Sequence, residues 1–310
     1  MNIPKQFIQT PLFRSRRAAA LYGLDVFYKM ECYQPSGSFK IRGMDEVMRG
    51  LSQQGHKKVI ASSGGNAGFS LALVGKAMDM EVCLVVPEST SAYMLNKIRQ
   101  AGATIEVHGE SWAEADAFAR SFSEEQQLPY VPPFDHPGLW RGHASMIDEC
   151  AREMAEPDRI IVAVGGGGLL CGICEGMERQ GWSGARIIAA ETEGANSFAR
   201  SLQAGKPVTL DRIDTIASSL GAKTVATKSL EYARQFNIES YVMDDRQAFQ
   251  ACASFADEYH VLVEPACGAA LSYIDTHAAS IDQGETTLVI VCGGVNMGVD
   301  RFNEYKALFA

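Results

Sequence analysis

Short runs of continuously apolar residues alternate along the chain with longer stretches whose apolar positions recur every three or four residues. The apolar runs predict strands at 58–61, 81–86, 159–164, 186–190 and 287–291. The stretches that follow them predict helices over 69–78, about 91–101 and from Leu169 onward. Strands that are apolar on both faces and separated by helices are typical of parallel sheets covered on both sides. The pattern therefore predicts an α/β fold.

Loops rich in glycine, serine or asparagine follow most of the predicted strands. They lie at 62–68, 165–168, 191–194 and 292–296, and Pro87 follows the strand at 81–86. Loops at the carboxyl ends of parallel strands line the ligand crevice, so we expect these loops to share one rim of the fold. A chain of 310 residues is long enough for about two domains. The strand–helix repeats divide it into residues 41–136 and the residues from 137 onward.

Composition excludes several classes of partner. The hydrophobic fraction of 46% and the charged fraction of 21% are typical of a globular chain. A net charge of -9 without a basic block argues against nucleic acid and anionic membranes as partners. No apolar run reaches the ~18 residues of a membrane span, and the polar N-terminus does not resemble a secretory signal. The 8 cysteines lie mostly in apolar surroundings, which predicts reduced thiols and a cytoplasmic location.

Four consecutive glycines, Gly165 to Gly168, follow a predicted buried strand and precede a predicted helix. Without side chains, their N–H groups can point into one concavity in front of the helix N-terminus, which suits a phosphate. The run does not match a dinucleotide fingerprint, because Leu170 or Cys171 occupies the position of its last glycine. The alternative interpretation is a flexible turn without a ligand.

Lys40 stands between Phe39 and Ile41 at a predicted helix start, with Ser38 as the expected N-cap. Apolar neighbours can desolvate the amine, lower its pKa and leave it nucleophilic. Most lysines in such a context are ordinary surface residues. Combined with a phosphate site elsewhere in the chain, however, Lys40 suggests a phosphorylated aldehyde cofactor held as a Schiff base.

Two further loops offer groups for the same chemistry. The hydroxyls and N–H groups of residues 62–68 suit a small carboxylate, although local turns would use the same residues. Cys292 ends a predicted strand and could face a ring nitrogen, although an inert core thiol is the commoner case. The pair Cys171 and Cys174 has C-x-x-C spacing but no second pair, and the histidines show no paired spacing, so we expect no zinc site.

Several segments together resemble one family, and the match runs through nearly the whole chain. They are 34–43, 62–68, 132–135, 142–145, 165–170, 264–270 and 292–294. The chain resembles the fold-type II pyridoxal-phosphate enzymes, whose two open, mainly parallel sheets flanked by helices are similar to the tryptophan synthase β subunit. Within them it resembles the short L-serine/L-threonine dehydratases, which are ammonia-lyases.

This resemblance implies roles for the matching residues. Lys40 would carry pyridoxal 5'-phosphate as a Schiff base, and Phe39 would lie against the cofactor ring. The remaining cofactor contacts would be Gly165, Gly166, Gly167, Gly168 and Leu169 at the phosphate, Asn66 at the ring hydroxyl and Cys292 at the pyridine nitrogen. The substrate carboxylate would bind Ser63, Gly64, Asn66 and Ala67.

The resemblance also implies a monovalent-cation site, a domain division and a homodimer. The cation ligands would be Gly165, Glu191, Ala195, Leu220 and Ala222, with carbonyl oxygens and one carboxylate that suit potassium. A large cofactor domain would comprise residues 1–40 and 137–310, and a small inserted domain residues 41–136.

The implied reaction is β-elimination. Lys40 would remove the Cα proton of an amino acid joined to the cofactor, and the β-hydroxyl would leave. L-Serine would give pyruvate and ammonia, and L-threonine 2-oxobutanoate and ammonia. A neutral thiol at Cys292 would leave the ring a weaker electron sink, which favours prompt elimination.

Gly64 departs from the pattern, since liver-type serine dehydratases carry alanine there and dehydratase-like relatives glycine. Its missing side chain is expected to open space near the substrate and affect rate and preference. Racemases place serine there as a second acid/base group, so Gly64 argues against racemisation. The chain ends at Ala310, and we expect no regulatory domain and no isoleucine feedback. The alternatives are a β-replacement enzyme similar to cysteine or threonine synthase and a non-catalytic binder of phosphate ligands.

Overall fold

The larger sheet forms the body of the molecule. The structure is a computed structural model that describes residues 4–310. Across these residues the larger sheet has the strand order β1-β2-β9-β6-β7-β8. Its strands are β1 (Leu12–Arg14), β2 (Asp25–Lys29), β6 (Arg159–Ala163), β7 (Arg186–Thr192), β8 (Ile238–Met243) and β9 (Thr286–Ile290). Strands β1 and β2 pair antiparallel, and the remaining neighbours in this order pair in parallel.

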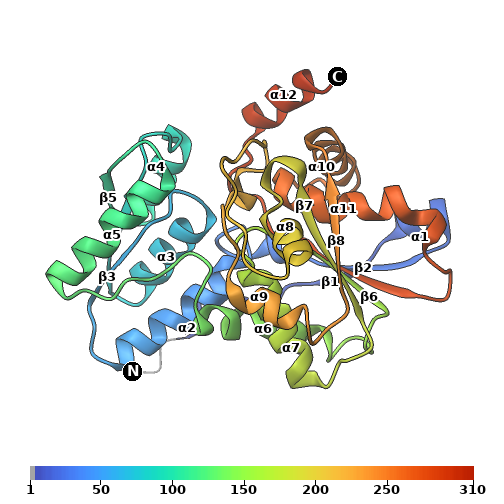
Figure 1. Cartoon of the computed structure of the whole chain (residues 1–310), viewed down its shortest axis with the longest axis horizontal. Helices are drawn as coiled ribbons and strands as arrows, with labels where there is room; N and C mark the ends of the chain where they lie inside the picture. The colour runs from blue at the N-terminus through green and yellow to red at the C-terminus, as the bar shows by residue number, and fades with distance from the viewer. Residues whose placement is uncertain (1–3) are drawn as a thin grey trace.

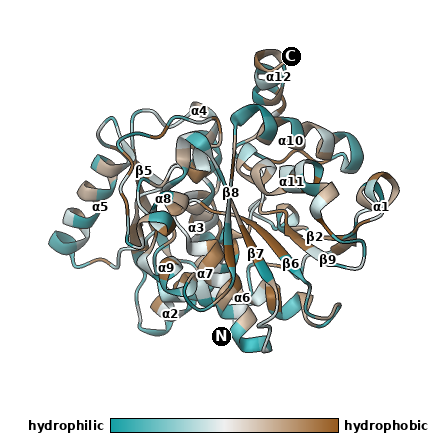
Figure 2. Ribbon diagram, turned by 45° about the vertical axis from the view of Figure 1, so that its right-hand side comes forward, coloured by the Kyte–Doolittle hydropathy of each residue, from teal (hydrophilic) through white to brown (hydrophobic). Residues whose placement is uncertain are grey.

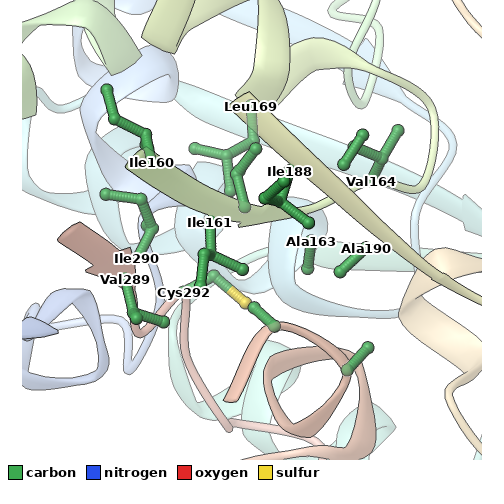
Figure 3. Close-up of a cluster of buried hydrophobic side chains, with 14 of the residues drawn as sticks. Ile160, Ile161, Ala163, Val164, Leu169, Ile188, Ala190, Val289, Ile290 and Cys292 are labelled. Carbon is green, nitrogen blue, oxygen red and sulfur yellow. The ribbon is translucent and has the colours of Figure 1, made fainter. Parts of the chain in front are cut away.

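Helices cover both faces of this sheet (Figure 1). They are α1 (Arg16–Tyr22), α6 (Pro137–Cys150), α7 (Gly168–Gln180), α8 (Ser197–Ala204), α9 (Thr227–Tyr232), α10 (Asp245–Tyr259), α11 (Pro265–His277) and α12 (Val299–Leu308). Short 3-10 turns lie at η1 (Glu31–Tyr33), η2 (Glu193–Ala195), η3 (Ser218–Leu220) and η4 (Ala278–Ser280). The central strands are brown, hence apolar, in Figure 2. Their side chains, among them Ile160, Ile161, Ile188 and Val289, form the cluster in Figure 3.

A second, three-stranded sheet lies beside the first, on the left in Figure 1. Its parallel strands are β3 (Lys58–Ala61), β4 (Glu81–Val86) and β5 (Thr104–Val107). The helices around it are α2 (Lys40–Gln53), α3 (Asn66–Ala77), α4 (Ala92–Gln100) and α5 (Trp112–Gln126). This sheet has its own apolar core, which includes Val59, Leu71, Leu84 and Ile98. The exact bounds of the two domains remain a prediction.

The predicted α/β fold with two open, mainly parallel sheets is confirmed. The strands at 58–61 and 81–86 have the predicted bounds, because each apolar run is flanked by polar or turn-forming residues. None of the helices within residues 4–310 is long and apolar enough to cross a membrane.

Two local predictions were wrong. Helix α3 begins at Asn66 rather than Phe69, since Gly68 lets the first turn pack against Ser63, whose carbonyl oxygen would lie 1.9 Å from a Cβ at position 68. Ser38 is not the N-cap of α2. That position belongs to Phe39 and has no side-chain cap, while Ser38 pairs with Gly293 in an isolated antiparallel bridge.

Candidate active site

A cavity of about 460 Å³ lies where loops of the two sheets meet. Every residue that the sequence predicted for the cofactor and the substrate lines it. These are Phe39, Lys40, Ser63, Gly64, Asn66, Ala67, Gly165, Gly166, Gly167, Gly168, Leu169 and Cys292. The expected common rim is therefore present for the loops after β3, β4, β6 and β9. The loop at 191–194 does not reach the cavity.

Lys40 is the first residue of α2, and its amine is fixed inside the site. Nζ donates a hydrogen bond to the Pro133 carbonyl oxygen at 2.6 Å and lies 5.2 Å from the centre of the Phe39 ring. Among residues 4–310, no carboxylate forms an ion pair with it. Burial lowers the pKa of Lys40 from 10.5 to about 8, against an opposing effect of Cys292 and Glu264. An amine with this pKa is neutral, and hence nucleophilic, in a substantial fraction near pH 8.

The glycine run forms a cradle in front of α7. A Cβ at Gly166 would lie 2.3 Å from the Phe134 ring, and one at Gly168 would lie 2.5 Å from the Phe134 carbonyl oxygen. Gly167 has a φ of +85°, which also favours glycine. Within the described residues the N–H groups of Gly166 and Gly167 have no hydrogen-bond partner. Unpaired N–H groups before a 13-residue helix are suited to an anion such as phosphate.

Asn66 and Glu264 form a polar contact across the cavity. Asn66 Nδ2 donates to Glu264 Oε1, while the buried Asn66 Oδ1 has no partner in the part of the chain that the structure describes. Glu264 also accepts hydrogen bonds from Ser219 Oγ at 2.9 Å and Asn296 Nδ2 at 3.0 Å. Burial raises the pKa of Glu264, although these three donors oppose the rise. Asn66 therefore has hydrogen-bonding capacity left for a ligand.

Cys292 lies just beyond β9 and is 6% exposed. Its thiol interacts with the thiol of Cys267, and this contact together with burial raises the pKa of Cys292 well above its usual value. The thiol is therefore neutral near pH 7. Figure 3 shows Cys292 among the apolar side chains at the ends of the central strands.

His143 packs against the ring of Phe39. The two rings meet edge to face with centroids 4.8 Å apart. Burial, with the positive charges of Lys40 and Arg42, lowers the pKa of His143 well below its usual value, so the imidazole is neutral. The sequence had marked the 142–145 run only as part of the resemblance.

Sequence reasoning assigned no role to several residues on the small-sheet side of the cavity. These are Ser89, Thr90, Ser91, Met94 and Trp112. Trp112 Nε1 donates a hydrogen bond to the Ser62 carbonyl oxygen at 2.8 Å, which connects α5 to the loop at residues 62–68. No periodicity marks these residues, because they meet only when β4, α4 and α5 pack together. Glu264 had a better signal, an acidic residue directly before a proline and a run of small residues.

The predicted effect of Gly64 needs correction. Thr90 fills the space that a side chain at position 64 would take. A Cβ there would lie 2.6 Å from Thr90 Cγ2 and 2.7 Å from Thr90 Oγ1. The missing side chain therefore does not leave an open space beside the substrate loop.

Of the five predicted cation ligands, Gly165, Leu220 and Ala222 line the cavity, whereas Glu191 and Ala195 do not. Glu191 is the last residue but one of β7, and its two oxygens accept hydrogen bonds from Phe198 N at 2.8 Å and Ala199 N at 2.7 Å. Burial raises the pKa of Glu191 to about 8. Leu220 lies against Gly165, Ala222 N donates to the Leu220 carbonyl oxygen, and Ala195 is buried. This arrangement leaves the cation site a prediction.

The C-x-x-C pair lies buried in α7. Within residues 4–310 no three His, Cys, Asp or Glu side chains are grouped so that they could hold a metal ion. This finding does not bear on an alkali-cation site built mainly from carbonyl oxygens.

Known proteins are similar to this chain in sequence and in fold over almost their full length. Residues 3–293 match the family described as "Pyridoxal-phosphate dependent enzyme". The chain is 40% identical over 306 residues to "Serine dehydratase-like" of Mus musculus, covering 96% of this chain and 93% of the relative. It is 38% identical over 309 residues to "L-serine dehydratase/L-threonine deaminase" of Homo sapiens, covering 96% and 94%. The crystal structure of an L-serine ammonia-lyase from Rhizomucor miehei superposes with a TM-score of 0.92 at 31% identity, covering 99% and 100%.

Proposed function

This chain belongs to the pyridoxal-phosphate dependent enzyme family, and from that premise we propose that it is a serine and threonine dehydratase. It converts L-serine to pyruvate and ammonia, and L-threonine to 2-oxobutanoate and ammonia. The observation that carries this proposal is the Lys40 amine, free of carboxylate partners within the described chain and in one cavity with the unpaired N–H groups of the glycine run.

The residues present fit pyridoxal phosphate. The glycine cradle leaves room and donors for a phosphate, Asn66 has an unpartnered buried oxygen within residues 4–310, and Lys40 supplies the amine. When bound, the cofactor supplies an aldehyde that joins amines and a conjugated ring that takes up the electrons of the broken Cα–H bond. Phe39 would lie against the ring, and Asn66 would bond to its hydroxyl through Oδ1 or the second hydrogen of Nδ2.

Lys40 also acts as the base. With a pKa of about 8, its Nζ can be neutral at working pH and can take the proton from the substrate's Cα. The hydrogen bond to Pro133 limits where that nitrogen can lie. Ser63, Gly64, Asn66 and Ala67 precede or begin α3, and the helix N-terminus suits the substrate carboxylate. Fixing the carboxylate and the amine sets which Cα bond faces Lys40.

Cys292 tunes the same site. A thiol with a raised pKa is a poor proton donor. Cys292 would therefore not keep the pyridine nitrogen of the cofactor protonated, and the ring would withdraw electrons less strongly. Weaker electron withdrawal favours loss of the β-hydroxyl soon after proton removal. Gly64 offers no proton on the opposite side, which disfavours racemisation.

We also propose three features that rest mainly on the resemblance. Gly165, Glu191, Ala195, Leu220 and Ala222 would bind potassium, and Glu191 supports this as a buried carboxyl without a cationic partner in the described chain. The enzyme would work as a homodimer in the cytoplasm, a location that the absence of disulfides among its eight cysteines favours. Sedimentation analysis would test the dimer.

Keto-acid and ammonia release from the purified, cofactor-loaded protein tests the function. We expect equal amounts of pyruvate and ammonia from L-serine, 2-oxobutanoate from L-threonine, and no release from L-alanine, which lacks the leaving hydroxyl. Faster cysteine formation from sulfide and an activated serine would instead establish a β-replacement enzyme. The absence of both reactions would leave a non-catalytic phosphate-ligand binder.

A further inference from the structure

The turn after β4 borders the cavity with three consecutive hydroxyl residues, Ser89, Thr90 and Ser91. Ser89 Oγ donates to the Glu110 carbonyl oxygen at 3.4 Å. Ser91 Oγ accepts from Met94 N at 3.3 Å and so caps α4. The side-chain hydroxyl of Thr90 has no hydrogen-bond partner anywhere in residues 4–310. The outer two hydroxyls therefore hold the turn, and the middle one is available to a ligand.

Thr90 lies directly against the loop that is suited to the substrate carboxylate. Its Cγ2 and Oγ1 lie 2.6 and 2.7 Å from the position of a Cβ at Gly64. The methyl and hydroxyl groups of Thr90 therefore occupy the space that a side chain at position 64 would take. The Thr90 backbone N–H donates a hydrogen bond to the Pro87 carbonyl oxygen at 3.0 Å, which holds the turn that carries this side chain.

We propose that Thr90 is a substrate-binding residue that determines specificity: its hydroxyl donates to the carboxylate of the amino acid, and its methyl limits the space beside the β-carbon. This inference rests on the proposed function of the cavity. A hydrogen bond from a free hydroxyl to a carboxylate is of the strong, charge-assisted kind. The methyl favours L-serine over L-threonine, which carries one more methyl at the β-carbon.

Two substitutions separate the two roles. Thr90→Val keeps the shape and removes the hydroxyl, and Thr90→Ser keeps the hydroxyl and removes the methyl. We expect Thr90→Val to raise KM for L-serine about tenfold with kcat within about twofold, as for loss of one hydrogen bond to a charged group. We expect Thr90→Ser to keep KM for L-serine within about twofold. It should raise the kcat/KM of L-threonine relative to L-serine by roughly threefold to tenfold.

A coupled substitution tests the contact with Gly64. A methyl at position 64 must displace the Thr90 side chain, so the two sites should not behave independently. We expect Gly64→Ala to change KM at least threefold in the wild-type background and by a smaller factor in a Thr90→Ala background. An identical factor in both backgrounds would contradict the contact.

Binding of L-alanine provides a readout that does not need turnover. L-Alanine has the carboxylate but no leaving hydroxyl, and its binding can be followed by the visible absorbance of the bound cofactor. Thr90→Val should raise its Kd about tenfold, whereas Thr104→Val, the same change at an exposed threonine of β5, should not. Equal spectra and melting temperatures before substrate addition would exclude misfolding.

The outcomes separate this inference from the proposed function. If the wild-type protein releases keto acid but Thr90→Val leaves KM and the L-alanine Kd within about twofold of the wild type, Thr90 is not the donor and the inference is overturned. If wild-type protein releases no keto acid but Thr90→Val still weakens L-alanine binding, the dehydratase function fails and the role of Thr90 in binding stands. If the wild-type spectrum does not respond to L-alanine or L-serine, both are overturned.

Discussion

Two lysines of this chain, Lys29 in the core and Lys40 at the cavity, have opposite surroundings. Lys29 is fully buried, and its Nζ bonds to Glu149 Oε2 at 2.6 Å and to the Thr10 carbonyl oxygen at 2.7 Å. Lys40 meets only a carbonyl oxygen, that of Pro133, and no carboxylate pairs with it in the described chain. Burial without a carboxylate partner lowers the pKa of Lys40 to about 8, whereas the Lys29 amine has a carboxylate within hydrogen-bond distance. The difference separates a structural lysine from a reactive one.

Helix α2 carries Lys40 and also contacts the buried charges around Lys29 through Arg42. Arg42 follows Lys40 by two residues, which turns it roughly 200° around the helix, toward the opposite side. There it forms ion pairs with Glu31 and Glu149 at 2.7 Å, all nearly or fully buried. This buried charge cluster of Lys29, Glu31, Arg42 and Glu149 fixes the helix that carries the reactive amine. Precise placement on one face therefore depends on paired charges on the other.

The largest expected effect is loss of turnover in Lys40→Ala. Without the amine there is neither an attachment point nor a base, so keto-acid release should fall roughly 10⁴-fold or more. The melting temperature should not fall, because no buried partner loses its ion pair. Lys57→Ala, at an exposed lysine, serves as the control. Keto-acid formation and thermal unfolding would be measured, and normal turnover in Lys40→Ala would overturn the assignment.

Glu149→Ala should lower the stability of the fold, in contrast to Lys40→Ala, which should lower turnover. Its removal leaves Lys29 and Arg42 with buried charge that is no longer balanced, which should lower the free energy of unfolding by about 3–5 kcal/mol. Urea denaturation would measure the loss, with Glu153→Ala at an exposed carboxylate as the control. A loss below about 1 kcal/mol would show that the cluster does not anchor α2.

Glu191 is the acidic counterpart of Lys40, buried and without an ion-pair partner in the described residues. If it serves potassium, Glu191→Gln should remove the stimulation of turnover by K⁺, an effect that we expect to be tenfold or less. The pKa of Glu191 is raised to about 8, so below that pH the carboxyl is protonated and binds the cation less well. Stimulation should therefore weaken as the pH falls from 9 to 7. Stimulation that persists in Glu191→Gln would place the ion elsewhere.

The smallest effect concerns pH. A pKa of about 8 for Lys40 means that its neutral fraction, and hence the rate at which the cofactor-free protein captures pyridoxal phosphate, should rise about fivefold between pH 7 and pH 8. The rate should level off above about pH 9. Stopped-flow absorbance would follow the capture. A midpoint near 10.5, the ordinary lysine value, would show that burial does not activate this amine.

Periodicity and motifs predicted the strands, the sheet type and the cavity residues that lie in strand-end loops. Sequence reasoning could recognise two segments because each is continuous in sequence: the run Ser62 to Gly68 and the glycine run Gly165 to Gly168. Thr90 and Trp112 could not, because their positions depend on how separate helices and turns pack around the cavity. Ser38 misled for the same reason, since a long-range bridge to Gly293 overrides its local preference for capping.

Reduction of the cofactor-loaded protein with borohydride, followed by digestion and peptide mass spectrometry, identifies the amine that holds the cofactor. The reduction fixes the bond between the cofactor and whichever amine holds it. We expect one modified residue per chain, Lys40, with Lys29 and the surface lysines unmodified. A modification on any other lysine, or none at all, would contradict it.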